Sequence, residues 1–184
     1  MSQSGREPGQ IRRVDARRNR AVVIEEARRL ALLGERVTIP RVATGVGLGA
    51  ATVKRHLGDR RQMEQAVADR SAALLWTEIV KAERIQDPLD RLGTILRILA
   101  NAQADARCVP TGEQVEVATR WRARVIAVAE KAFLQASGAG LLRPDARPIE
   151  LTTHHEIVQA LVAGGGSRML AQQAVTQLLR ALKR

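Results

Sequence analysis

The sequence predicts an all-α protein of about nine helices, and its composition and its apolar periodicity both support this. Tyr is absent, Phe133 is the single phenylalanine, and Trp76 and Trp121 are the two tryptophans. Strands favour aromatic and β-branched residues, whereas this chain is rich in Ala, Leu, Arg, Glu and Gln, which are strong helix formers. Apolar residues also recur at spacings of three and four residues, as they do on one face of a helix.

The first helix is expected to follow a non-helical segment. Residues 1–15 are polar, contain Gly and Pro and show no apolar period, so they are expected to form a flexible basic arm. A helix is expected from Arg17 to Leu33, ended by Gly34. Its apolar face is formed by residues at positions i, i+4, i+7 and i+8: Val23, Ala27, Leu30 and Ala31.

Two short helices are expected next, separated by a glycine turn at Gly45 and Gly47. The first begins at Thr38, a plausible N-cap, tolerates Pro40 in its first turn and buries Val42 and Ala43. The second covers about Ala50 to Leu57, with Ala50, Val53 and Leu57 on one face and Gly58 at its end. Asp59 then caps a new helix, with Gln62 three residues later completing a variant of the capping box.

The second half of the chain is expected to contain longer and more apolar helices. One covers about residues 60–84, and the next follows Asp87-Pro88. The apolar face of that second helix is formed by Leu92, Ile95, Leu96 and Leu99. Three further helices are expected at about 113–137, 149–163 and 171–182. Loops are expected at 105–112 and 138–148, where Gly and Pro gather, and at Gly164-Gly165-Gly166.

Charge and cysteine content restrict the function. The chain carries a formal net charge of +11; residues 1–70 hold 15 basic and 8 acidic side chains, so most of the excess lies there. A concentrated positive field favours polyanions such as nucleic acid or an anionic membrane surface. With one cysteine, Cys108, the chain has no intramolecular disulfide and no multi-cysteine metal site. No apolar run approaches the roughly 20 residues that span a bilayer and the start is polar, so a soluble cytoplasmic protein is expected.

The segment 38–57 is typical of a helix-turn-helix. Two short helices this close must pack on their neighbours, and the second then projects its outer face, as in proteins that insert this helix into the major groove. Its outward positions are Ala51, Thr52, Lys54 and Arg55, with His56 at the boundary. Arg55 can bind guanine through two hydrogen bonds, and Lys54 can bind a phosphate or guanine. The alternative is a helical hairpin with a solvated charged face.

These residues resemble the DNA-binding domain of the TetR (tetracycline repressor) family. The segment VATGVGLGAATVKRHL at 42–57, followed by GDRRQMEQAV, is similar to the family pattern Ile-Ala-x-x-Ala-Gly-Val-Ser, a small residue, Thr or Ser, then Leu-Tyr-x-His-Phe and a later Lys and Leu. Val42-Ala43 stand for its Ile-Ala, Gly47-Leu48 for its Gly-Val, and Thr52-Val53 for its Thr-Leu. His56-Leu57 stand for its His-Phe, Arg60 for its Lys and Met63 for its closing Leu. Lys54 replaces the usual Tyr and Gly49 the usual Ser. The resemblance covers residues 18–70.

The resemblance implies a homodimeric repressor that binds a palindromic operator in double-stranded DNA and is released by a small-molecule effector, with no cofactor. It implies a DNA-binding domain at 16–62 and an effector-binding and dimerisation domain at 63–184. The residues expected to contact DNA are Arg17, Arg18, Thr38, Arg41, Ala51, Thr52, Lys54, Arg55, His56, Arg60 and Arg61. The arm arginines, which include Arg6, Arg12 and Arg13, are expected to add affinity with little specificity.

The C-terminal helices are expected to form the dimer interface and, with their neighbours, an apolar or amphipathic effector pocket. Val175, Leu178, Leu179 and Leu182 form a stripe that needs a partner, on this chain or another, and Ile157 and Leu161 extend the expected interface. The residues expected at the pocket are Trp76, Leu99, Trp121, Val125, Phe133, His154 and Val158. Instead of lining a pocket, the aromatic residues could pack in the core, and His154 could have a purely structural role. A metal site would need more ligands than the histidines offer, so none is expected.

No enzymatic constellation is visible, and the chain is not expected to be an enzyme. GVGLG at 45–49 lacks the preceding strand and the downstream lysine of a phosphate-binding loop. Two other classes of function stay open beside the effector-controlled repressor. One is a DNA-binding protein without an effector, and the other is a basic helical module that binds an acidic protein or membrane surface. Redox sensing through Cys108 is the less favoured reading of a lone cysteine.

Overall fold

The computed structural model contains eight helices, α1 to α8, within the residues that it describes, against about nine expected. It describes residues 8–106, 115–165 and 167–184, with side chains described in 18–105, 123–165 and 167–184. Over these ranges the regular structure is helical, and one isolated β-bridge joins Leu142 to Lys183. The all-α prediction is therefore confirmed. The chain divides into two compact units, Met1–Ser71 and Ala72–Arg184.

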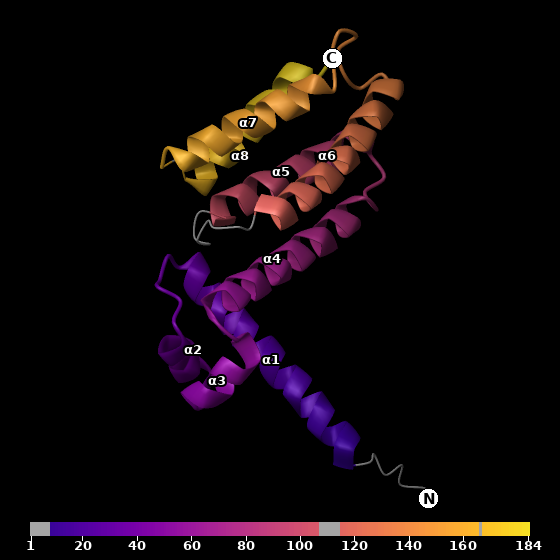
Figure 1. Ribbon diagram of the computed structural model, residues 1–184. Helices are drawn as coiled ribbons and strands as arrows, with labels where there is room; N and C mark the ends of the chain where they lie inside the picture. Colours follow the sequence, from indigo (N-terminus) through magenta and orange to yellow (C-terminus); the bar gives the residue numbers. More distant parts are fainter. Residues whose placement is uncertain (1–7, 107–114, 166) are drawn as a thin grey trace, which may run out of the picture. The chain divides into compact units, whose positions relative to one another are not determined.

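The first unit contains α1 (Pro8–Leu32), α2 (Ile39–Val46), α3 (Ala50–Leu57) and the beginning of α4 (Arg60–Ala82). α1, α2 and α3 pack against one another, with α1 contacting both α2 and α3 (Figure 1). The stripe predicted on α1 is buried, because Val23 and Ala27 are fully inaccessible and Leu30 and Ala31 nearly so. Side chains of this small size let the two short helices lie close to α1.

Local capping determines where the short helices begin and end. The hydroxyl of Thr38 accepts a hydrogen bond from the backbone N–H of Arg41 at 3.4 Å, and Gly47 ends α2 in the left-handed conformation with φ of 67°. At the start of α4, Asp59 and Gln62 form the predicted capping box. The Gln62 N–H donates to the Asp59 carboxylate at 2.8 Å, and the Asp59 N–H donates to the Gln62 amide oxygen at 2.9 Å.

Two expectations for this unit are wrong. α1 begins at Pro8, so residues 8–15 are helical and the flexible arm expected over 1–15 does not extend that far. Pro is favoured at the first helical position, and adding turns to an existing helix costs much less than nucleating one. The second error is Ala50, which is exposed, while Val53 and Leu57 form the buried face of α3 as predicted.

The second unit contains the rest of α4 together with α5 (Pro88–Ala106), α6 (Val115–Gly138), α7 (Ile149–Ala163) and α8 (Arg168–Leu182). α5 packs against α6, α7 and α8, and α7 packs against α6 and α8 (Figure 1). α7 has the predicted bounds. α8 begins three residues earlier than expected, because the hydroxyl of Ser167 accepts a hydrogen bond from the Leu170 N–H at 3.4 Å and caps the helix.

The apolar stripe predicted on α8 packs into the core of the second unit. Val175 and Leu182 are 1% and 0% exposed, and Leu178 and Leu179 pack partly buried against the same core. A Cβ added to Gly93 of α5 would lie 3.0 Å from Leu179, so these two helices approach closely there. The stripe is therefore covered by its own chain, and the expectation that Val175 and Leu182 lie in a dimer interface is wrong.

Candidate DNA-binding surface and ligand pocket

α3 presents a positively charged outer face on the first unit. Val53 and Leu57 bury its inner face, and Ala51, Lys54 and Arg55 are exposed on the other side. Neither Lys54 nor Arg55 has an ion-pair partner in the part of the chain that the structure describes. Their cations are thus available to a polyanion. Thr52 and His56, also predicted to contact DNA, are half-exposed on the same helix.

The carboxyl end of α3 is held by a residue that sequence reasoning missed. The guanidinium of Arg20 on α1 donates a hydrogen bond to the backbone carbonyl of His56. The last carbonyls of a helix have no partner within it, and a cation there also interacts favourably with the helix dipole. Arg20 therefore positions the helix from which Lys54 and Arg55 project. The sequence around Arg20 contains several arginines and does not indicate which of them contacts α3.

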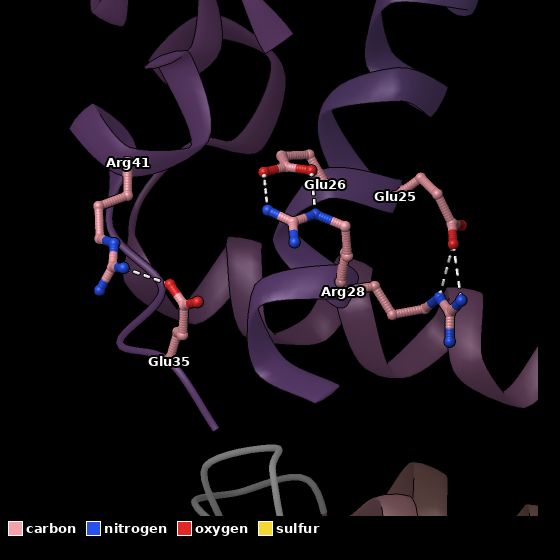
Figure 2. Close-up of polar contacts among 6 residues, drawn as sticks. Glu25, Glu26, Arg28, Glu35 and Arg41 are labelled. Carbon is pink, nitrogen blue, oxygen red and sulfur yellow. Dashed lines mark hydrogen bonds and ion pairs between the residues drawn. The ribbon is translucent and has the colours of Figure 1, made fainter. Parts of the chain in front are cut away.

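Ion pairs occupy the side of the unit around α1 and α2 (Figure 2). Glu25 accepts from Arg28 at 2.7 Å and from Arg70 of α4 at 3.1 Å, and Glu26 accepts from Arg29 at 2.7 Å. Hydrogen bonds from Arg28 and Arg29 hold the pKa values of these two carboxyls below their ordinary range. Five of the described cations in the first unit thus form ion pairs with carboxylates of the same unit, because Arg41 pairs with Glu35 and Arg60 with Glu64.

Gly45 is a second positioning residue that the sequence showed only as part of a turn. It lies within α2, and a Cβ there would meet the Glu26 carboxylate oxygen at 2.1 Å. The absence of a side chain lets Glu26 of α1 lie directly against α2. A glycine inside a helical pattern often has such a packing reason, and that signal was available from the sequence.

The other predicted DNA contacts differ in their exposure and in their partners. Arg18, Arg41, Arg60 and Arg61 are exposed, and Thr38 is half-exposed because it caps α2. Arg60 at the start of α4 forms an ion pair with Glu64 at 2.8 Å. The side chains of Arg6, Arg12, Arg13 and Arg17 lie outside the described residues.

A pocket in the second unit is lined by side chains from α5, α6, α7 and α8. Leu99, His154 and Val158 line it as predicted. Val125 and Phe133, also predicted there, are buried in the core with 1% exposure each and do not line this pocket in the described structure. The enclosed part has a volume of about 20 Å³, within a void of about 370 Å³ that includes open solvent.

Both tryptophans were predicted to line the pocket, and the structure describes the side chain of Trp76 alone. Trp76 of α4 does not line the pocket: it packs partly buried against the core, and the Arg124 guanidinium lies 3.9 Å from its ring centroid. This is a cation–π contact that ties α4 to α6. The side chain of Trp121 and all of Cys108 lie outside the described residues.

The adjacent histidines of α7 differ in their partners. The amide nitrogen of Gln103 on α5 lies 2.9 Å from Nδ1 of His155, so those two side chains hydrogen-bond to each other. His154 is half-buried, and its Nε2 is buried without a hydrogen-bond partner among the described residues. Burial lowers the pKa of His154 from its ordinary value. No group of three potential metal ligands occurs in the described ranges.

Comparison with solved structures shows the fold. A candidate TetR-family transcriptional regulator from Rhodococcus sp. superposes with a TM-score of 0.65 at 17% identity, covering 89% of this chain and 97% of that one. The ketosteroid transcriptional regulator KstR2 of Mycobacterium tuberculosis gives 0.63 at 16% identity, covering 90% and 95%. A regulatory protein of the tetR family from Rhodococcus RHA1 gives 0.61 at 15% identity, covering 89% and 96%.

The chain therefore has the fold of TetR-family transcriptional regulators. No protein-family model matches the chain. No curated protein matches it either. Among the described helices, none combines the length and apolar character needed to cross a membrane.

Proposed function

We propose that this chain is a homodimeric, DNA-binding transcriptional repressor that a small molecule releases from its operator. The observation that carries the DNA-binding part is the outer face of α3, where Lys54 and Arg55 are exposed and free of carboxylates. The fold supports the same proposal, because the solved structures that share it are transcriptional regulators. In this proposal α3 enters the major groove and reads base edges.

The basic residues around α3 would then contact the phosphates. Arg60 and Arg61 lie at the start of α4, and both are exposed. Arg41 and Arg60 are paired with Glu35 and Glu64 in the structure, so binding DNA exchanges these exposed ion pairs for phosphate contacts. Exposed pairs are worth little, about 0–1 kcal/mol, so this exchange costs little.

Binding to the intergenic DNA beside the protein's own gene tests the proposal. The full-length chain should bind one labelled duplex from that region and not its scrambled version, with an affinity that falls steeply as salt rises. Lys54→Gln with Arg55→Gln should weaken this binding by at least a factor of 30, since each base contact contributes roughly 1–3 kcal/mol. Arg97→Gln is the matched control, because Arg97 is exposed on α5 of the other unit.

Two outcomes would favour the alternatives. Equal binding to the specific and the scrambled duplex would support a basic module that binds polyanions without reading sequence. Specific binding that no small molecule alters would support a DNA-binding protein without an effector. An unchanged affinity in the Lys54 and Arg55 variant would overturn the assignment of α3.

The dimer interface in this proposal is the exposed apolar face of α7 and the start of α8. Ile157 and Leu161, both predicted there, are 50% and 40% exposed, and Met169 and Leu170 add 66% and 43%. Large apolar residues clustered at a surface mark interaction sites. Ile157→Glu with Leu161→Glu should convert a dimer into a monomer in analytical ultracentrifugation. Leu134→Glu on α6, at a position that is 60% exposed, should leave the dimer intact.

Release by a ligand would act through α4. This helix runs without interruption from Arg60, beside the DNA-contacting residues in the sequence, to Ala82 in the second unit, and it includes Trp76. A ligand shifts DNA affinity only if it binds the two arrangements of the dimer with different affinity. The pocket between α5, α6, α7 and α8 is the proposed effector site.

A further inference from the structure

The pocket of the second unit is almost entirely aliphatic. Eight of its eleven lining residues are Leu, Ile, Val or Ala, and none is Lys, Arg, Asp or Glu. The three polar residues are Gln103 of α5 and His154 and His155 of α7. A ligand that fills this space therefore needs an apolar body, because water is displaced from apolar walls over most of its surface.

One residue that lines this pocket carries a polar atom without a hydrogen-bond partner among the described residues. Gln103 and His155 hydrogen-bond to each other across α5 and α7, whereas Nε2 of His154 is buried with no partner among the described residues. Leaving a buried polar group without a hydrogen bond is costly, on the order of 1–3 kcal/mol. A ligand that supplies one polar atom at this point recovers that cost.

The pocket also excludes charged ligands. A carboxylate or ammonium buried among these residues would lose its hydration without gaining an ion-pair partner, and that loss is expensive. The pKa of His154 is lowered by burial, so the imidazole is neutral at pH 7 and supplies no cation. A hydroxyl group fits either tautomer of a neutral imidazole, because it can both donate and accept a hydrogen bond.

We propose that this pocket binds a small, uncharged aliphatic molecule whose single oxygen group hydrogen-bonds to Nε2 of His154. The proposal rests on the proposed function only where that molecule acts as the effector. The pocket volume of about 20 Å³ is smaller than such a molecule, so the lining side chains must move apart as the ligand enters, and a short chain is favoured over a bulky one.

Histidine-selective NMR of the full-length protein without DNA tests the proposal directly. The chain has three histidines, so ring nitrogens labelled with ¹⁵N give a spectrum in which His154 is identified by its loss in His154→Leu. Titration with butan-1-ol should shift the His154 Nε2 signal in a saturable way and leave the ring of His56 unchanged. Butanoate, matched in chain length but charged, should bind at least tenfold more weakly.

A substitution at His154 distinguishes the contribution of the hydrogen bond to ligand affinity from the contribution of the apolar walls. His154→Leu removes the buried polar atom, so the variant should fold and be at least as stable as the natural chain, yet bind butan-1-ol about fivefold more weakly, the value of one hydrogen bond. Thr153→Val is the control, because Thr153 is exposed on α7 and does not line the pocket; it should bind butan-1-ol like the natural chain.

Three results would overturn the proposal: no saturable shift at His154, equal binding of butan-1-ol by His154→Leu, or butanoate binding as tightly as the alcohol. Because no DNA is present, a failure to bind an operator leaves these results intact. Conversely, an alcohol that binds at His154 and does not release DNA would support the pocket assignment and overturn only its role as an effector site.

Discussion

In the first unit the residues assigned to DNA lie on the surface, and short-range contacts fix the backbone beneath them. Thr38 and Gly47 define where α2 begins and ends, and the Asp59–Gln62 pair defines where α4 begins. In the second unit the residues assigned to a ligand line a pocket whose walls come from four helices, and they depend on long-range packing. Local capping therefore fixes the ends of α2 and the start of α4, and Arg20 adds one long-range contact to α3, whereas the pocket depends on packing among four helices.

The interiors of the two units differ in the same way. The buried residues of the first unit are Ala, Val, Leu and Met, without an aromatic ring, whereas the second unit buries Phe133 among large aliphatic side chains. Small side chains suit short helices that lie close together, and a large ring fills the wider space between long helices. Substitutions in the two interiors should therefore affect stability to different extents.

The largest expected effect is the loss of Phe133. Phe133→Ala should lower the free energy of unfolding of the second unit by about 3–5 kcal/mol, because it removes a large buried side chain and leaves a cavity. Leu134→Ala, at the neighbouring and 60% exposed position, should change it by less than about 0.5 kcal/mol. Urea unfolding followed by tryptophan fluorescence reports on this unit, since it contains both tryptophans. Similar losses in the two variants would contradict a core centred on Phe133.

The next effect concerns the support of α3. Arg20→Met should weaken binding to the specific duplex by roughly 5- to 30-fold, because α3 loses the donor at its last turn and a cation near its carboxyl end. Amide hydrogen exchange at the end of α3 should become faster. Arg29→Met removes the same charge from the same helix, but Arg29 pairs with Glu26, so exchange in α3 should not change. If Arg29→Met had the same effect on exchange, charge and not positioning would be the cause.

A smaller effect is expected in the glycine turn. Gly47→Ala should destabilise the first unit by about 1 kcal/mol, because φ is 67° there and a Cβ is strained in the left-handed region. Gly49→Ala, two residues later, has φ of −66° and open space around a new Cβ. It should change stability by only a few tenths of a kcal/mol. Equal losses at both positions would show that backbone conformation does not limit stability in this turn.

The two units should also respond to acid over different pH ranges. Burial lowers the pKa of His154 below its ordinary 6.5, so the unfolded chain binds more protons there, and the second unit should lose stability as the pH falls below about 6.5. Hydrogen bonds to Arg28 and Arg29 lower the pKa values of Glu25 and Glu26 below 4.5. Their stabilisation of the first unit is complete above about pH 4.5 and is lost as the pH falls through the lowered values.

Unfolding measured at a series of pH values tests this difference. Tryptophan fluorescence follows the second unit, and amide NMR signals of α1 and α2 follow the first. His154→Leu should remove the loss of stability that begins near pH 6.5 and leave the first unit unchanged. A common onset for both units, or a loss that persists in His154→Leu, would contradict the assignment.

Periodicity, capping residues and turn glycines are local, and they were sufficient to predict most of the helices and the helix-turn-helix. The Asp59–Gln62 capping box, the buried stripe around Val23 and Ala27, and the bounds of α7 all follow from residues within a few positions of one another. The exposed cations Lys54 and Arg55 were predictable in the same way, because the buried face of a short helix defines its outer face.

Only the tertiary structure decided which partner each face meets. The stripe containing Val175 and Leu182 had to be covered, and packing against α5 showed that its own chain covers it. The hydrogen bond from Arg20 to α3 joins residues 36 positions apart. Nε2 of His154 is buried without a partner among the described residues, and the sequence around it does not indicate this. The apolar periodicity that defines one face of a helix carries no information on which other helix covers that face, or at what distance. Both depend on how all the helices fill the core together.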